Sequence, residues 1–179
     1  MSIRAPRFLL VPCALGTLFL AGCGNRPNSN RMDYEMGERI TVGPLTYNVV
    51  ESVWRSQLGP EVKPRLPQHR FLLITISATN GGGHEVALPL LQLENSNNET
   101  FPESDNGEGV ENWFGILRSL APAATQQGRL LFDVPLSSYR LRLTDGAPAG
   151  SEKYVWVNIP LRMDVDTGVQ TPLPQPTAK

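Results

Sequence analysis

Thiol and imidazole groups are scarce in this chain, which has two cysteines and two histidines among its 179 residues. Cys13 lies inside an apolar N-terminal stretch and Cys23 follows shortly after it. The remainder has no thiol for a disulfide, so its fold must rest on a hydrophobic core. His69 and His84 have no second residue of metal-ligand type beside them, and no Gly-x-Ser-x-Gly turn accompanies them. We therefore expect no enzyme, no catalytic residues, no metal site and no cofactor.

The part of the chain after Cys23 is also poor in positive charge. All 17 acidic residues but only 14 of the 16 basic residues follow Cys23, which gives this part a formal charge of −3. A surface that binds nucleic acid needs a basic stripe to displace counterions from the phosphates. We therefore expect no nucleic-acid partner. With 40% hydrophobic and 18% charged residues, the length suits one globular domain.

No apolar run reaches the roughly 20 residues that a helix needs to cross a bilayer. The N-terminus instead has the parts of an export signal: basic Arg4 and Arg7, an apolar stretch over residues 8–20, and two small residues before Cys23. Residues 1–22 are therefore predicted to be a signal peptide that is removed on export.

The residues Leu20-Ala21-Gly22-Cys23 resemble the lipobox of bacterial lipoproteins. The resemblance implies that the Cys23 thiol is the lipid-attachment site, with acyl chains such as palmitate that hold the protein on a membrane. By the same resemblance, Gly24 in place of Asp favours the outer membrane, with the domain in the periplasm. An ordinary secretory signal that ends in a chance cysteine is the alternative.

Composition divides the rest of the chain into three parts. Residues 23–35 are mostly polar and predict a lipidated tether, whereas residues 163–179 predict a Pro-rich disordered tail. The folded domain should span residues 36–162. Short apolar runs separated by turn residues predict strands there at residues 38–42, 45–54, 71–79, 85–93, 129–134, 139–143 and 154–161.

The strand pattern predicts an all-β, immunoglobulin-like antiparallel β-sandwich. In residues 129–134, Leu130, Phe132 and Val134 alternate with more polar neighbours, as in a half-buried sheet. In residues 45–54, strict alternation would bury Glu51, so we expect a bulge near Val50 that returns Val53 to the core side.

Five segments resemble, in order and spacing, the telokin-like domains of unknown function (DUF4352-type) of bacterial secreted proteins and lipoproteins. They are Met36-Gly37-Glu38, residues 42–47, residues 71–80, residues 93–101 and Phe132-Asp133-Val134-Pro135. The resemblance implies an immunoglobulin-like sandwich over nearly all of residues 36–161. It implies no catalytic residue, because the family has none assigned.

Two loop segments have patterns of their own. The acidic residues between Glu99 and Glu111 do not have the ligand spacing of an EF-hand, which favours a solvated polar loop over a calcium site. Residues 111–120 have helical spacing, with Trp113, Ile116, Leu117 and Leu120 on one face. We expect a short helix that caps the sandwich, although the same segment could instead contact a partner or lipid.

Residues 154–161 should place Val155, Val157, Ile159 and Leu161 in the core and the intervening side chains outside. If this strand pairs with residues 139–143, then Arg140, Arg142, Tyr154 and Trp156 share the outer face. Such a row is either a surface cation–π ladder or a partner-binding face, because Trp, Tyr and Arg dominate binding hot spots.

These observations favour a lipid-anchored, non-catalytic module for binding or assembly in the bacterial cell envelope. Its expected contacts are the membrane, through the N-terminal lipid, and another envelope protein. A protein that binds a small ligand or an envelope glycan is the second hypothesis, and an enzyme of unknown type is the third.

Overall fold

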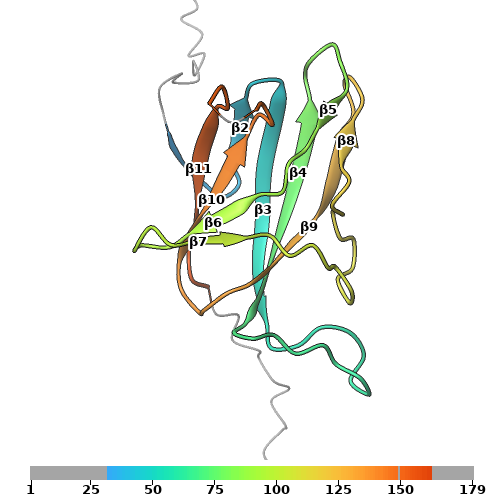
Figure 1. Ribbon diagram of the computed structural model, residues 1–179, viewed down its shortest axis with the longest axis vertical. Coiled ribbons are helices and arrows are strands. Elements are labelled where there is room, and N and C mark those ends of the chain that lie inside the picture. The colour runs from blue at the N-terminus through green and yellow to red at the C-terminus, as the bar shows by residue number, and fades with distance from the viewer. Residues whose placement is uncertain (1–31, 149, 163–179) are drawn as a thin grey trace, which may run out of the picture.

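The described residues of the chain, 32–148 and 150–162, form strands and loops without a helix (Figure 1). Cys23, the predicted signal peptide and the predicted tail lie outside the described residues of this computed structural model. The strands are β1 (Asp33–Glu35), β2 (Arg39–Val42), β3 (Leu45–Arg55), β4 (Phe71–Asn80), β5 (Val86–Ala87), β6 (Gln92–Glu94), β7 (Thr100–Pro102), β8 (Ser119–Leu120), β9 (Thr125–Asp133), β10 (Tyr139–Thr144) and β11 (Tyr154–Ile159). In the described part of the chain, no helix is long and apolar enough to cross a membrane.

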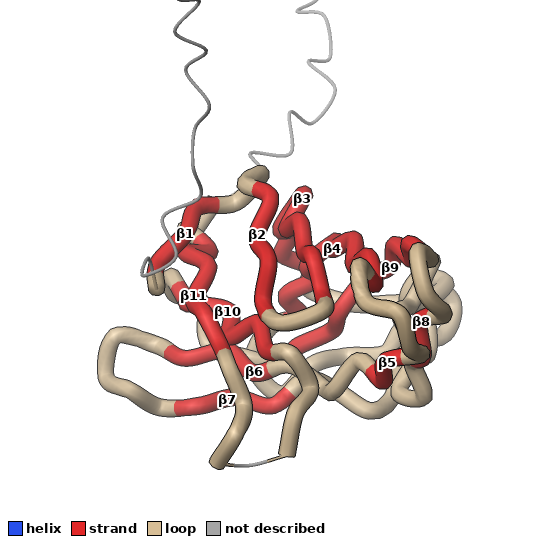
Figure 2. Tube along the Cα trace, turned by 90° about the horizontal axis from the view of Figure 1, so that it is seen from above, coloured by secondary structure: helices blue, strands red, loops and turns tan. Residues whose placement is uncertain are grey.

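Two sheets form the layers of a β-sandwich, as Figure 2 shows from above. One sheet has the order β1-β11-β10-β6-β7 and the other the order β2-β3-β4-β9, while β5 and β8 form a small separate ladder. All these pairings are antiparallel except that of β1 with β11. The predicted immunoglobulin-like sandwich is confirmed.

The main core lies between the two sheets. Leu72, Ile74 and Ile76 of β4 are buried there together with Leu141 of β10 and Val157 of β11. The predicted alternation is also confirmed, because Leu130 and Phe132 of β9 and the following Val134 all belong to this core. The predicted half-buried sheet is wrong here, because Leu131 on the other face is fully buried as well. Burial of such side chains contributes about 1.5 to 3 kcal/mol each, which suits a fold without disulfides.

A second, smaller core covers the outer face of the four-stranded sheet. Phe71, Leu73 and Leu131 are buried there under Leu58 from the loop between β3 and β4, and Val110 packs against them. This second core explains why residues 71–74 are all buried: β4 is covered on both of its faces. A strand that is buried on both faces has a continuous apolar run rather than an alternating one.

The predicted bulge in β3 is confirmed, but its effect on Val53 was predicted wrongly. The register with β4 shifts between Val49 and Glu51. The inserted residue moves Ser52 opposite Ile74 and Trp54 opposite Leu72, and Trp54 packs against the main core. Val53 therefore lies on the outer side, because a one-residue insertion inverts the alternation that follows it.

Several predicted boundaries differ from the structure. The stretch 85–93 divides into β5 and β6, and β11 ends at Ile159, which leaves Leu161 exposed. The folded domain begins at Asp33 rather than at residue 36, because β1 pairs with β11.

The helix predicted over residues 111–120 is wrong. Asn112 and Gly115 have φ angles of 54° and 80°, which interrupt any right-handed helix. Leu117 is 95% exposed, whereas Phe114 is buried in the core and its backbone N–H donates to the Arg129 carbonyl at 3.0 Å. The segment therefore consists of turns that meet β9 at an isolated bridge between Trp113 and Arg129, and it ends in β8, which pairs with β5.

Candidate binding face

Strands β10 and β11 determine which side chains reach the outer face of the five-stranded sheet. Their antiparallel register places Arg142 opposite Trp156 and Arg140 opposite Asn158. Leu141 and Val157, between them, are buried in the core. The predicted pairing and the predicted alternation of these strands are therefore confirmed, with Leu161 as the exception.

The four predicted site residues form one row of stacked side chains. The Arg142 guanidinium carbon lies 4.2 Å from the centre of the Tyr154 ring, and that of Arg140 lies 4.9 Å from the Trp156 ring. The two rings meet edge to face, with centroids 5.9 Å apart and an angle of 78° between their planes. We call these four residues the aromatic–arginine row.

Carboxylates fix the outer ends of both arginine side chains. Arg142 donates to Glu152 at 2.7 Å, and Arg140 donates to Glu94 of β6 and lies 3.8 Å from Asp33. Each guanidinium is thus held between an aromatic ring and a carboxylate. The row is close to charge-balanced, which favours recognition by stacking and shape over attraction of a charged ligand.

Strand β1 closes one side of this face. Its residues run parallel to β11, with Asp33 opposite Trp156, and the Trp156 backbone N–H donates to the Met32 carbonyl at 2.8 Å. The Asn158 side-chain amide donates to the Glu35 carboxylate at 2.7 Å. The segment that leads to the predicted tether therefore lies directly beside Trp156.

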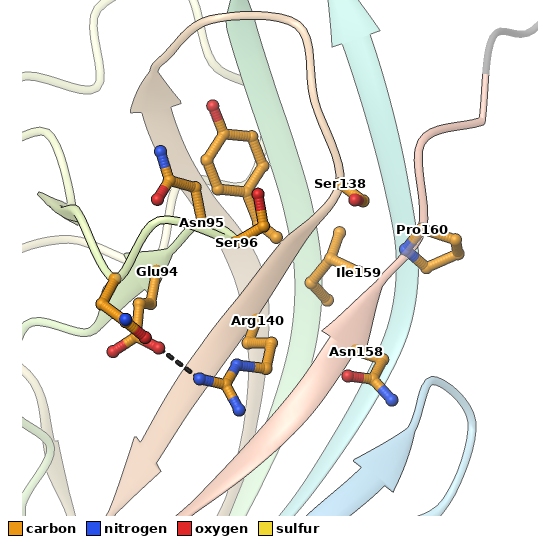
Figure 3. Close-up of a pocket in the computed structure, with 10 residues that line it drawn as sticks. Glu94, Asn95, Ser96, Ser138, Arg140, Asn158, Ile159 and Pro160 are labelled. Carbon is orange, nitrogen blue, oxygen red and sulfur yellow. Dashed lines mark hydrogen bonds and ion pairs between the residues drawn. The ribbon is translucent and has the colours of Figure 1, made fainter.

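A cleft of about 400 Å³ adjoins the row at Arg140. Its walls come from the hairpin between β6 and β7, the start of β10 and the end of β11. Figure 3 shows the Glu94–Arg140 ion pair in this cleft, with Asn95, Ser138 and Asn158 nearby. Sequence reasoning missed the cleft, because its walls come from three separate parts of the chain.

The sequence predicted a solvated acidic loop between Glu99 and Glu111, but this prediction is wrong for one of its residues. Glu103 is buried and forms an ion pair with Arg118, whose guanidinium lies 5.1 Å from the Phe114 ring centre. The Leu91 backbone N–H donates to the other Glu103 oxygen at 3.1 Å. Burial raises the pKa of the Glu103 carboxyl, although Arg118 partly offsets that effect. This pair joins the two ends of the loop between β7 and β8, and both side chains are fully buried.

The described residues contain no group of three or more His, Cys, Asp and Glu side chains that could hold a metal ion. His69 lies beside Asp133, whose carboxylate accepts hydrogen bonds from the Gln68 and His69 backbone N–H groups at 2.6 and 2.8 Å. That arrangement closes a loop rather than activating a nucleophile. The chemistry offered by the aromatic–arginine row and the cleft is stacking and hydrogen bonding.

Solved structures share this fold at low sequence identity. The yjhA protein from Bacillus subtilis superposes with a TM-score of 0.56 at 14% identity, over 70% of this chain and 98% of that one. A functionally unknown protein from Listeria monocytogenes gives 0.52 at 12% identity, over 70% and 82% of the two chains. A "putative lipoprotein (ycdA)" from Bacillus subtilis gives 0.55 at 14% identity, over 70% of this chain and 39% of that one.

Among curated proteins, no sequence matches the chain significantly. The profile of one family, described as "Domain of unknown function (DUF4352)", matches residues 34–155. That range runs from β1 into the start of β11 and so includes at least part of every strand of both sheets. The chain therefore belongs to the DUF4352 family of β-sandwich domains.

Proposed function

We propose that this chain is a lipoprotein of the bacterial cell envelope whose β-sandwich binds another envelope protein through the aromatic–arginine row. The lipobox-like residues before Cys23 support the anchor, and the fold is shared with the protein described as "putative lipoprotein (ycdA)". Gly24 supports the outer membrane, with the domain on the periplasmic side. No catalytic step is part of this proposal.

The observation that carries the binding role is the fixed geometry of the row. Tyr154 is exposed and Trp156 half-buried, and their rings contact each other and the two arginines rather than the core. Side chains that are already held in place lose little conformational entropy when a partner binds. Trp, Tyr and Arg are also the residue types that dominate binding energy at protein interfaces.

The predicted tether limits where the partner can be. Cys23 lies ten positions before Asp33, and Asp33 pairs with Trp156. An extended chain spans at most about 3.6 Å per residue, so the row lies within roughly 36 Å of the lipid. The proposed partner is therefore a protein of the membrane or one held close to it.

Site-specific photocrosslinking in cells tests this proposal. A photoreactive phenylalanine analogue in place of Tyr154 should give one reproducible adduct with another envelope protein. The matched control carries the same analogue in place of Gln126, which is exposed on β9 of the other sheet. The adduct should be absent from the control and weakened by Trp156→Ala. No adduct at position 154, or the same adduct at both positions, would contradict a binding role for the row.

A further inference from the structure

The cleft beside Arg140 is suited to a ligand of a different kind. We propose that it binds an uncharged glycan, with side-chain amides and hydroxyls as the hydrogen-bonding groups. This proposal does not rest on the protein partner, because it concerns the groups inside the cleft and can be measured with purified protein.

The charge of the cleft favours a neutral ligand. Glu94 and Arg140, the ionised residues in its lining, are paired with each other. Tyr139, also in the lining, donates its hydroxyl to the Pro135 carbonyl at 2.6 Å. A charged ligand would have to compete with the Glu94–Arg140 pair, whereas a neutral ligand would leave the pair intact.

Several polar groups of the lining have no partner among the described residues. The Ser96 and Ser138 hydroxyls and the Asn98 side-chain amide form no hydrogen bond there, and Asn158 uses only its NH₂ group, on Glu35. These groups comprise both donors and acceptors, as a sugar hydroxyl requires. Ile159 and Pro160 add apolar surface beside them, and a volume of about 400 Å³ falls within the range of ligand sites.

The backbone around the cleft argues against an extended peptide. The strands that contribute, β6, β10 and β11, each have a neighbour on both sides, so none offers a free edge. In the β6–β7 hairpin, Asn97 and Glu99 donate their backbone N–H groups to the Asn95 side chain, and Asn98 donates to the Asn95 carbonyl. Recognition in this cleft therefore depends on side chains, which suits a sugar better than a peptide backbone.

The same hydrogen bonds fix the rim of the cleft. The Asn95 amide also donates to Glu99 at 2.6 Å, which closes the hairpin on itself. Asn98 has a φ of 62°, a left-handed conformation that Asn tolerates better than most residues. The hairpin thus fixes the backbone from which the Asn98 side chain projects.

Titration of the acylated protein in nanodiscs tests the inference. The probes are chitotetraose and maltotetraose as neutral glycans, tetragalacturonate as an anionic glycan, and tetraalanine as a peptide, with binding followed by calorimetry. At least one neutral glycan should bind saturably. Asn98→Gly, which removes the amide and still permits the left-handed backbone, should weaken that binding about three- to tenfold.

The neighbouring Asn97→Gly is the matched control. Asn97 belongs to the same hairpin but not to the lining of the cleft, so its replacement should leave the affinity unchanged. Four results would overturn the inference: no saturation by either neutral glycan up to about 10 mM, tighter binding of tetragalacturonate, binding of tetraalanine alone, or equal weakening by both Gly variants. Thermal unfolding of each variant shows whether a loss of binding reflects a loss of folding.

Discussion

Replacement of Trp156 by Ala tests whether the outer face of β10 and β11 binds a partner or only stabilises the fold. The ring contacts Arg140 and the Tyr154 ring, which contribute about 0.5 to 1 and about 0.5 to 1.5 kcal/mol respectively. Because the ring lies outside the core, the variant should lose about 1 to 2 kcal/mol of unfolding free energy. Co-purification of the proposed envelope partner should nevertheless be lost.

Val157→Ala is the internal comparison, because Val157 is fully buried on the opposite side of the same strand. Deletion of two methyl groups removes about 1.6 kcal/mol of transfer free energy, and the remaining cavity raises the cost to about 2 to 3 kcal/mol. Urea unfolding followed by circular dichroism measures both variants without relying on tryptophan fluorescence. A larger loss for Trp156→Ala than for Val157→Ala would refute this reasoning, because the ring would then belong to the core.

Three further predictions concern the anchor and the buried ion pair. Cys23→Ser should leave an unacylated precursor, because a hydroxyl is a poorer nucleophile than a thiolate. Intact mass and detergent partitioning show whether the protein is cleaved and acylated. If the Ser variant is cleaved and enters the detergent phase like the parent protein, residues 20–23 are not a lipobox. Arg118→Met should cost about 3 to 5 kcal/mol, because it leaves the buried Glu103 carboxylate uncompensated. Glu103→Gln combined with Arg118→Met should recover most of that loss in urea unfolding, and additive losses would contradict the pairing. Burial raises the pKa of Glu103 in the folded state, so its contribution to stability should fall as pH rises from 4.5, its ordinary value, through the folded pKa. Glu103→Gln should abolish this part of the pH dependence of unfolding, and an unchanged profile would show that another group produces it.

The longer strands were predictable because their apolar residues follow the period of a pleated sheet. The outer position of Arg140 and Trp156 follows from that alternation, once β10 and β11 are taken as neighbours. The pairing of β1 with β11 could not be predicted in the same way. It joins residues 33–35 to residues 156–158, and three residues are too few for a periodic signal.

The errors in the loops have physical causes as well. Helical spacing in residues 111–120 gave no sign of the left-handed conformations of Asn112 and Gly115, which are residue types that adopt this conformation readily. The burial of Glu103 depends on Arg118, which is distant enough in sequence that composition treats both as surface residues. The cleft depends on three segments that meet only in the folded sheet.

The parallel pairing of β1 with β11 has a mechanical consequence. Under the proposed function, the lipid holds the chain at Cys23 and a partner holds the face of β10 and β11, so tension along the axis of β1 acts on its pairing with β11. The hydrogen bonds of β1 then bear the load together in shear, rather than opening one after another as at a peeled edge. Resistance to such a pull is set by the rate of forced unfolding rather than by equilibrium stability. In the proposed arrangement, the three-residue strand β1 is the first strand of the domain to bear tension from the membrane.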